Sequence, residues 1–303
     1  MTRILCIGIA TLDQVFALDA MPTAPEKYRA ADLVVTTGGT AANAAVAVAR
    51  LGGDAGFLGE LGDDRIGDDI VAGLEREGVD CAGVRRVEGK RSPLSAILVD
   101  RAGERIVISH SDPELPGSTE RLPDRLPAGV GAVLGDTRWQ AGSAHLFGLA
   151  RAAGVPAVLD ADRAPEERPE LLELATHVAF SLQGLRDLTG LDDPRAGLAA
   201  LALPARAFVA VTNGAEGVFF REGGAVVHAP AFPVEAVDTL GAGDVWHGAF
   251  ALALAEGLDE RAAVRFASAA AAIKCTRFGG RDGAPSRAEV EAFLSACDIA
   301  RVG

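Results

Sequence analysis

The residues best suited to chemistry lie in one glycine-rich segment, Asp238–Asp244 (DTLGAGD), which is followed by an apolar stretch typical of a helix. Backbone N–H groups at the start of a helix have no intrahelical acceptor and stand at the positive end of the helix dipole, so Gly241, Ala242 and Gly243 could bind an anion such as phosphate. Asp244 beside them could stabilise the helix start or accept a proton from an attacking hydroxyl. By itself the segment predicts either a capped helix or a site of phosphoryl transfer.

A second glycine-rich segment, Gly38–Ala44 (GGTAANA), also leads into a helix, with Gly38 and Gly39 in the turn and Asn43 inside. Asp13 follows the first apolar strand, and ligands gather at the carboxyl ends of parallel strands. Both features also permit a structural interpretation, as a helix start with Thr40 as N-cap and as a turn aspartate.

A third segment, Val211–Gly217 (VTNGAEG), follows a predicted strand and precedes another. The Thr212 hydroxyl and the exposed amides near Gly214 and Gly217 would suit phosphate contacts. An Asn-Gly hairpin turn explains the same residues.

The elements that must position these segments alternate between short apolar runs and helical patterns, which predicts an α/β fold with a largely parallel sheet. Predicted strands are 4–9, 132–135, 157–160, 177–181 and 208–212. Predicted helices are 41–51, 67–77, 142–153, 193–202, 243–256, 260–274 and 287–297.

Two stretches, 15–37 and 92–109, look like extended β segments without intervening helices. Residues 95–99 and 104–109 flank the turn 100–103, which predicts a hairpin. These strands could form a flap over a site, a dimer surface or an extension of the main sheet.

Composition excludes several classes of protein. The 303 residues carry a net charge of −13, which argues against nucleic acid as the main partner. No apolar run reaches the ~18 residues of a membrane span, and the four cysteines lack zinc-ligand spacing, so we expect reduced thiols in a cytoplasmic protein. No Walker A motif occurs, and no GxGxxG follows the first strand.

Taken together, the two glycine-rich segments resemble the C-terminal and N-terminal signatures of the PfkB (ribokinase-like) carbohydrate kinases. The resemblance implies one domain over residues 1–303, a three-layer α/β/α sandwich with a mostly parallel sheet, and a small β-sheet lid with strands within 14–38 and 92–110. It also implies Asp244 as catalytic base and the Gly241–Gly243 amides as anion hole. The sugar would be held by Asp13, Gly38, Gly39 and Asn43.

The same resemblance implies ATP with Mg²⁺ as phosphoryl donor. The nucleotide would lie along Thr212, Gly214, Gly217 and Cys275, and Asp238 and Thr239 would contribute to a monovalent cation (K⁺) site. One departure concerns an N-x-x-E motif that supports magnesium in many members, because this chain has Ser181 and Gly184 at those places.

Further segments resemble the sulfofructose kinase branch, in which cationic side chains at the places of Lys27 and Arg138 hold a sulfonate, with residue 109 nearby. Ser109 is shorter than the asparagine that can stand there, so the pocket could differ. We therefore predict a homodimeric kinase, joined through the lid strands, that converts 6-deoxy-6-sulfofructose to its 1-phosphate. Fructokinase, ketohexokinase and 2-keto-3-deoxygluconate kinase are alternatives, and a non-catalytic sugar sensor is a more remote one.

Overall fold

The computed structural model describes residues 1–101, 103–115, 117–204 and 206–302. Its larger sheet has the strand order β13-β12-β11-β10-β9-β8-β1-β4-β5. The pairs from β11 across to β5 are parallel, and β12 and β13 add an antiparallel edge. The strands are β1 (Arg3–Ile7), β4 (Asp54–Gly62), β5 (Asp80–Val87), β8 (Val130–Asp136), β9 (Ala157–Ala161), β10 (His177–Ser181), β11 (Phe208–Thr212), β12 (Val218–Glu222) and β13 (Ala225–Ala229).

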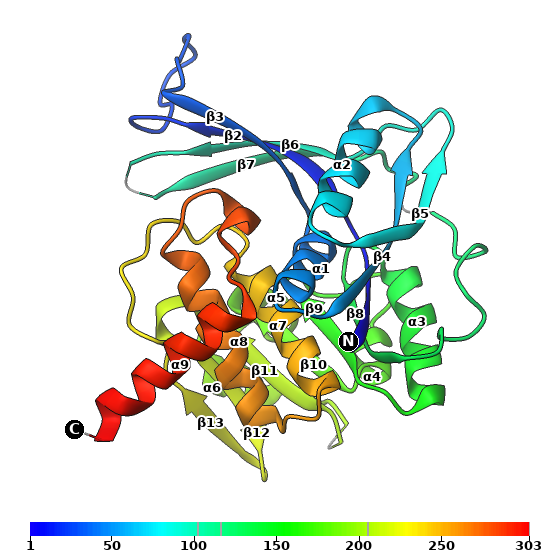
Figure 1. The fold of residues 1–303 in the computed structure, drawn as a ribbon, viewed down its shortest axis with the longest axis vertical. Coiled ribbons are helices and arrows are strands. Elements are labelled where there is room, and N and C mark those ends of the chain that lie inside the picture. Colours follow the sequence, from blue (N-terminus) through cyan, green and yellow to red (C-terminus); the bar gives the residue numbers. More distant parts are fainter. Residues whose placement is uncertain (102, 116, 205, 303) are drawn as a thin grey trace.

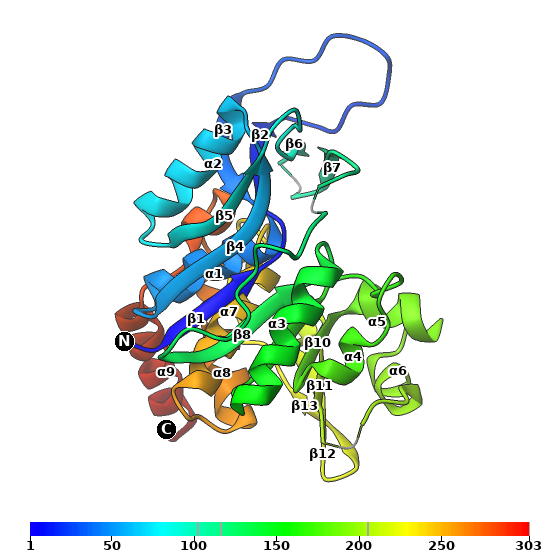
Figure 2. The same ribbon diagram turned by 90° about the vertical axis from the view of Figure 1, so that its right-hand side faces the viewer.

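Helices cover both faces of this sheet, as Figures 1 and 2 show. One face packs against α1 (Thr40–Arg50), α2 (Arg65–Arg76), α7 (Ala242–Ala255), α8 (Glu260–Cys275) and α9 (Arg287–Val302). The other packs against α3 (Gln140–Ala153), α4 (Leu171–Leu174), α5 (Leu182–Thr189) and α6 (Pro194–Ala200). Central strands such as β9 are buried on both faces, which explains why they are continuous apolar runs. Two 3₁₀ turns, η1 (Gly214–Glu216) and η2 (Gly280–Gly283), complete the regular elements.

A second, smaller sheet stands above the carboxyl ends of the parallel strands (Figure 1). Its order is β3-β2-β6-β7, from β2 (Thr11–Ala17), β3 (Asp32–Gly38), β6 (Leu94–Val99) and β7 (Arg105–His110). The chain passes from β1 to β2 within three residues, Gly8–Ala10, so the small sheet is anchored directly to the central strand.

The predicted ribokinase-like α/β/α fold with a small β-sheet is confirmed. The hairpin appears as β6 and β7, although residue 102 of its predicted turn lies outside the described residues. Thr40 is not the N-cap of α1, because the helix begins at Thr40 itself and Gly39 occupies the cap position. The Thr40 hydroxyl instead donates a 2.7 Å hydrogen bond to Asp136 Oδ2.

Candidate active site

A cavity of about 320 Å³ lies between the small sheet and the carboxyl ends of β1 and β8. It brings together most of the residues that the sequence predicted to bind sugar or carry chemistry. Those in its lining are Asp13, Gly38, Gly39, Asn43, Ser109, Arg138, Gly241 and Asp244. Residues from both ends of the chain therefore meet at one hollow, as a binding site requires.

Asp244 is one of the carboxylates that line this cavity, and it lies in the first turn of α7. Asn43 Nδ2 donates a hydrogen bond to Asp244 Oδ2 at 2.7 Å. Burial raises the pKa of Asp244 to about 7, while the Asn43 hydrogen bond opposes that rise. A carboxyl group with such a pKa can accept a proton near neutral pH, which suits a general base.

Close packing of α1 against α7, at positions with small residues, places Asn43 against Asp244. Helix α1 is buried along most of its length and consists largely of alanine. A Cβ atom at Gly248 of α7 would stand 2.4 Å from the Ala44 carbonyl oxygen, so glycine is required where the helices touch. The residue types of both helices therefore set the distance between the Asn43 amide and the Asp244 carboxylate.

The turn that precedes α7 has the backbone geometry of an anion site, although one of its three predicted amides is already hydrogen-bonded. Gly241 adopts a left-handed conformation (φ 76°), which glycine tolerates best, and caps the helix. The Ala242 N–H is already engaged, since it donates to the Thr239 carbonyl at 3.2 Å. A Cβ atom at Gly243 would meet nothing within 4 Å, so that residue borders open space. The anion hole predicted from three amides would thus depend on Gly241 and Gly243.

The small sheet presents a polar row to the cavity. Thr36, Asp13, Ser95 and Ser109 lie opposite one another on four neighbouring strands, and all four line the cavity. Directly paired residues share one face of a sheet, so the row forms the ceiling of the site. Thr36 and Ser95 were not singled out from the sequence, because their significance depends on strand register.

Asp13 is the carboxylate of this ceiling. It accepts a 2.7 Å hydrogen bond from the Thr11 hydroxyl. Burial raises its pKa, against the opposing effects of the Thr11 and Ser95 hydroxyls and of Arg281. A Cβ atom at Gly38 would stand 1.8 Å from Asp13 Oδ2, so the absent side chain makes room for the carboxylate.

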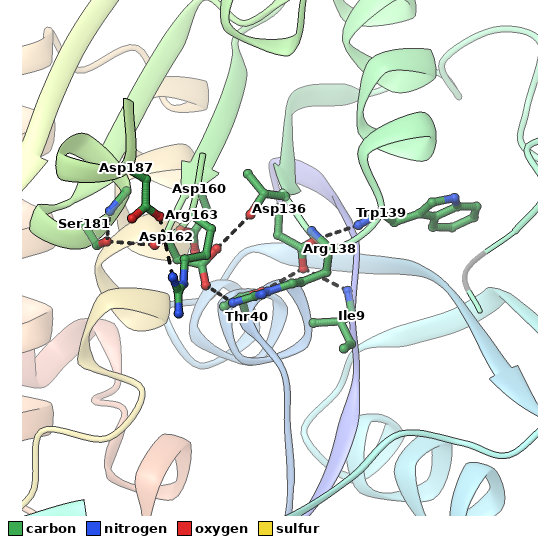
Figure 3. A network of polar contacts seen from close by, with 12 residues as sticks. Ile9, Thr40, Asp136, Arg138, Trp139, Asp160, Asp162, Arg163, Ser181 and Asp187 are labelled. Carbon is green, nitrogen blue, oxygen red and sulfur yellow. Dashed lines mark hydrogen bonds and ion pairs between the residues drawn. The ribbon is translucent and has the colours of Figure 1, made fainter. Parts of the chain in front are cut away.

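Below the cavity a polar network centres on Asp136, which ends β8 and is fully buried (Figure 3). Asp136 accepts hydrogen bonds from Ile9 N at 2.8 Å, from the Thr40 hydroxyl and from Arg138 N at 2.9 Å. Asp136 was given no role from the sequence. Its position at a strand end, like that of Asp13, was the available signal. The network ties β1, α1 and β8 together beneath the site.

Arg138 lies at the edge of the same network, and its guanidinium forms an ion pair with Asp162 (Figure 3). Its side chain keeps 43% of its surface exposed. The positive charge of Arg138 therefore lies at the cavity wall, where it is already paired with Asp162.

Ser181 and Gly184, which replace the N-x-x-E pair, have structural roles here. The Ser181 hydroxyl caps α5 by accepting a hydrogen bond from Gly184 N at 2.9 Å. A Cβ atom at Gly184 would stand 2.1 Å from the Ala161 carbonyl oxygen, so a glutamate cannot be placed there without moving the backbone. Among the described residues no cluster of three or more His, Cys, Asp or Glu side chains suits a metal ion.

Several predicted residues lie outside the cavity lining. Lys27 is exposed in the connection between β2 and β3. Thr212 ends β11 beside Ser181. Gly214 begins the short turn η1 after it, and Gly217 follows that turn. The Cys275 carbonyl accepts hydrogen bonds from the Val237 and Asp238 N–H groups. Their assigned roles in binding sulfonate or nucleotide stay predictions.

A larger hollow of about 460 Å³ lies elsewhere, between β12, β13 and helices α8 and α9. Its lining is mostly apolar and includes Phe220, Phe232 and Pro233. Among the described residues its lining holds no Asp or Glu, and its titratable side chains are His228, Arg261, Arg265 and Cys297.

The fold and the cavity, with a half-buried carboxylate beside a glycine-rich helix start under a β-sheet, agree with the sugar kinase class. A family model described as pfkB family carbohydrate kinase matches residues 1–287. The chain belongs to this family of phosphotransferases, which act on an alcohol group.

Three similar proteins agree with this assignment. The ribokinase of Bacillus subtilis is 32% identical over 97% of this chain and 100% of its own length. An ATP-dependent ribose-1-phosphate kinase of Halopiger xanaduensis is 33% identical over 97% of this chain and 99% of its own. The crystal structure of a putative ribokinase from Agrobacterium tumefaciens has 41% identity and a TM-score of 0.91, covering 98% of this chain and 99% of that one.

Proposed function

We propose that this enzyme transfers the γ-phosphoryl group of Mg·ATP to a primary hydroxyl of a sugar bound beneath the small sheet, with Asp244 as general base. The observation that carries the proposal is the cavity itself, in which Asp244, with its pKa near 7, stands next to the glycine-rich turn before α7. ATP as donor agrees with the Halopiger relative, which is an ATP-dependent kinase.

The acceptor hydroxyl donates its proton to Asp244 as the oxygen attacks phosphorus in line. Asn43 holds the base through Nδ2, and its Oδ1 is a buried acceptor without a partner among the described residues. Since such an atom is costly to leave unpaired, we assign it to a sugar hydroxyl. Asp13 and Ser95 of the ceiling bind further hydroxyls and orient the sugar.

The charge that develops on the transferred group meets the Gly241 and Gly243 amides at the start of α7. Magnesium would arrive bound to ATP, because the phosphates supply oxygen ligands for the ion, and it would neutralise part of the phosphate charge. Gly184 leaves no space for a supporting glutamate. The small sheet covers the cavity as a lid and excludes water, which limits hydrolysis of ATP.

For the acceptor we propose a sugar with a fixed anionic group, 6-deoxy-6-sulfofructose being the compound to test first. Arg138 supplies a cation at the cavity wall, and Ser109 and Ser111 add hydroxyl donors there. A relative named for an anionic acceptor, ribose 1-phosphate, supports a charged substrate. Neutral ribose is the second candidate, favoured by the ribokinase of Bacillus subtilis.

A substrate panel tests the proposal. Coupled ADP detection with sulfofructose, fructose, 2-keto-3-deoxygluconate, ribose and ribose 1-phosphate should show the highest kcat/KM for an anionic sugar. A higher value for a neutral sugar would remove the anionic acceptor but keep the kinase. Tight sugar binding without ADP formation from any compound would instead indicate a sensor.

We also propose a homodimer through the lid. The face of the small sheet opposite the polar row carries exposed apolar side chains, with exposed fractions of 49% for Leu33, 55% for Val35, 43% for Ile106 and 62% for Ile108. Paired rows such as Leu33, Phe16, Leu98 and Ile106 make this face continuous. An apolar patch of this kind is typical of a protein interface. Light scattering should give a dimer mass, and Ile108→Glu should give a monomer.

The enzyme is proposed to work in the cytoplasm. All four cysteines are free thiols, as expected in a reducing compartment. No helix among the described residues has the length and apolar character needed to span a bilayer.

A further inference from the structure

Lys274 is a lysine buried completely within the protein. It lies in the last turn of α8, and its side chain has no exposed surface. Its Nζ donates a hydrogen bond to the Asp238 carbonyl oxygen at 2.6 Å and lies 3.1 Å from Asp238 Oδ2. Since burial of an ammonium group is costly unless it is paired, this position requires an explanation.

The partner of Lys274 begins the glycine-rich segment that ends at the catalytic base. The Asp238 carboxylate also accepts hydrogen bonds from Leu240 N at 2.8 Å, Gly279 N at 3.1 Å and Gly280 N at 2.9 Å. These contacts, with Lys274, hold the pKa of Asp238 below its usual value although burial opposes this. One carboxylate therefore joins the end of α8, the turn at Gly279 and the loop that leads to Asp244.

The resemblance to the kinase family predicts that a monovalent cation binds around Asp238 and Thr239. The oxygens available to such an ion are already engaged. Asp238 presents both its carbonyl and its carboxylate to Lys274, and the Thr239 hydroxyl accepts a 2.9 Å hydrogen bond from Arg105 Nη1 of the lid. The Cys275 carbonyl nearby accepts the Val237 and Asp238 N–H groups.

An added cation at Asp238 would also stand beside the Lys274 ammonium and be repelled by it. The residues present therefore do not fit a potassium ion at this place. An ammonium group carries the same single charge and has three donors to satisfy the surrounding oxygens.

We propose that Lys274 is a built-in monovalent cation, a positioning residue that fixes the loop from Asp238 to Asp244, and that the enzyme consequently needs no potassium. The inference rests on the proposed function for its relevance to catalysis. The replacement of an ion by a side chain can be tested without turnover, through the melting temperature of the protein.

The first test compares the native enzyme in KCl, NaCl and tetramethylammonium chloride at equal ionic strength. The melting temperature and kcat/KM should be the same in all three salts. A higher melting temperature or a several-fold higher kcat/KM specifically in KCl would overturn the proposal.

The second test uses Lys274→Ala and Lys274→Met. The alanine variant opens a space beside Asp238, so potassium or methylammonium should raise its melting temperature above that in tetramethylammonium and restore part of its activity. The methionine variant fills the space, so the same cations should leave it unchanged. A misplaced loop should lower kcat on the order of 10²-fold in both variants.

Two results would contradict a cation role. Full activity of Lys274→Met would show that the charge is dispensable, and a Lys274→Ala variant whose melting temperature ignores all cations would show a packing role alone. If Lys274→Met does not fold, Lys274→Ala still decides through its melting temperature. If no sugar is phosphorylated by the native enzyme, the melting temperatures decide while the kinase proposal fails separately.

Discussion

Asn43 of α1 donates a 2.7 Å hydrogen bond to Asp244 of α7, and the two residues stand 201 positions apart in the sequence. This bond joins the two glycine-rich segments into one site, because each segment supplies the first turns of one of the packed helices. In the proposed reaction Asn43 therefore has two contacts, through Nδ2 with the base and through Oδ1 with the sugar.

Replacement of Asp244 by Asn should lower kcat by ~10²- to 10⁴-fold, since the acceptor hydroxyl loses its proton acceptor. Sugar binding, measured by calorimetry, should persist because Asp13, Asn43 and the ceiling remain. Asp68→Asn, a similar change on the exposed face of α2, is the control and should keep full activity. Turnover near the native level in Asp244→Asn would remove Asp244 as the base.

The raised pKa of Asp244, about 7, predicts a pH dependence. A base must be deprotonated, so kcat/KM should fall as pH drops through about 7 and level off above it. Because the Asn43 hydrogen bond favours the charged carboxylate, Asn43→Ala should move this acid limb to higher pH. A limb that stays in place, or that appears near pH 4 (the ordinary range of a carboxyl group, ~3.9), would contradict the assignment.

The close approach of Asp13 to Gly38 leads to a prediction about steric fit. Its missing side chain leaves space for Asp13, since a Cβ atom would stand 1.8 Å from Oδ2. Gly38→Ala should displace this carboxylate and raise KM for the sugar at least ~10-fold, by loss of one charge-assisted hydrogen bond.

Gly148→Ala is the matched control, because a Cβ atom there, within α3, meets nothing within 4 Å. That variant should keep the native KM and gain ~0.5–1 kcal/mol of stability by a better helix propensity. Equal KM values for the two variants would show that Asp13 does not bind the sugar.

The sequence predicted the architecture well where local pattern decides it. Buried parallel strands such as β10 and β11 are continuous apolar runs, and their bounds match the predicted 177–181 and 208–212. Strands β4 and β5 were not predicted. β4 contains Gly56, Gly59 and Gly62, and β5 is rich in arginine, so neither has the composition expected of a strand.

The site was predicted where it depends on contiguous motifs and missed where it depends on register or on the packing of distant elements. Asp244 and Asn43, which line one cavity, were singled out because each lies in a glycine-rich segment, and their roles stay predictions. Ser95 became visible only as the cross-strand partner of Asp13. Arg281 lines the cavity and is 4% exposed, and its Nε and Nη1 have no hydrogen-bond partner among the described residues. Arg281 was given no role from the sequence, because its place in the cavity depends on the fold.

Arg138 gives the sharpest test of the anionic acceptor. Its guanidinium is paired with Asp162, so a sulfonate would have to share or displace that carboxylate, and the gain from the new contact would be reduced. Arg138→Ala should nevertheless raise KM for sulfofructose ~10- to 100-fold, the range of a charge-assisted hydrogen bond. KM for a neutral sugar should change little, and kcat should stay close to native because Asp244 is untouched.

Arg163→Ala is the matched control, since Arg163 pairs with the nearby Asp187 at 3.6 Å and is not part of the cavity lining. Steady-state kinetics of both variants with sulfofructose and fructose would separate the possibilities. A rise of KM by the same factor for both sugars in Arg138→Ala would mean that the arginine shapes the pocket through Asp162 rather than binding an anion. In that case the acceptor would be a neutral sugar, and the charge at the cavity wall would serve the network around Asp136.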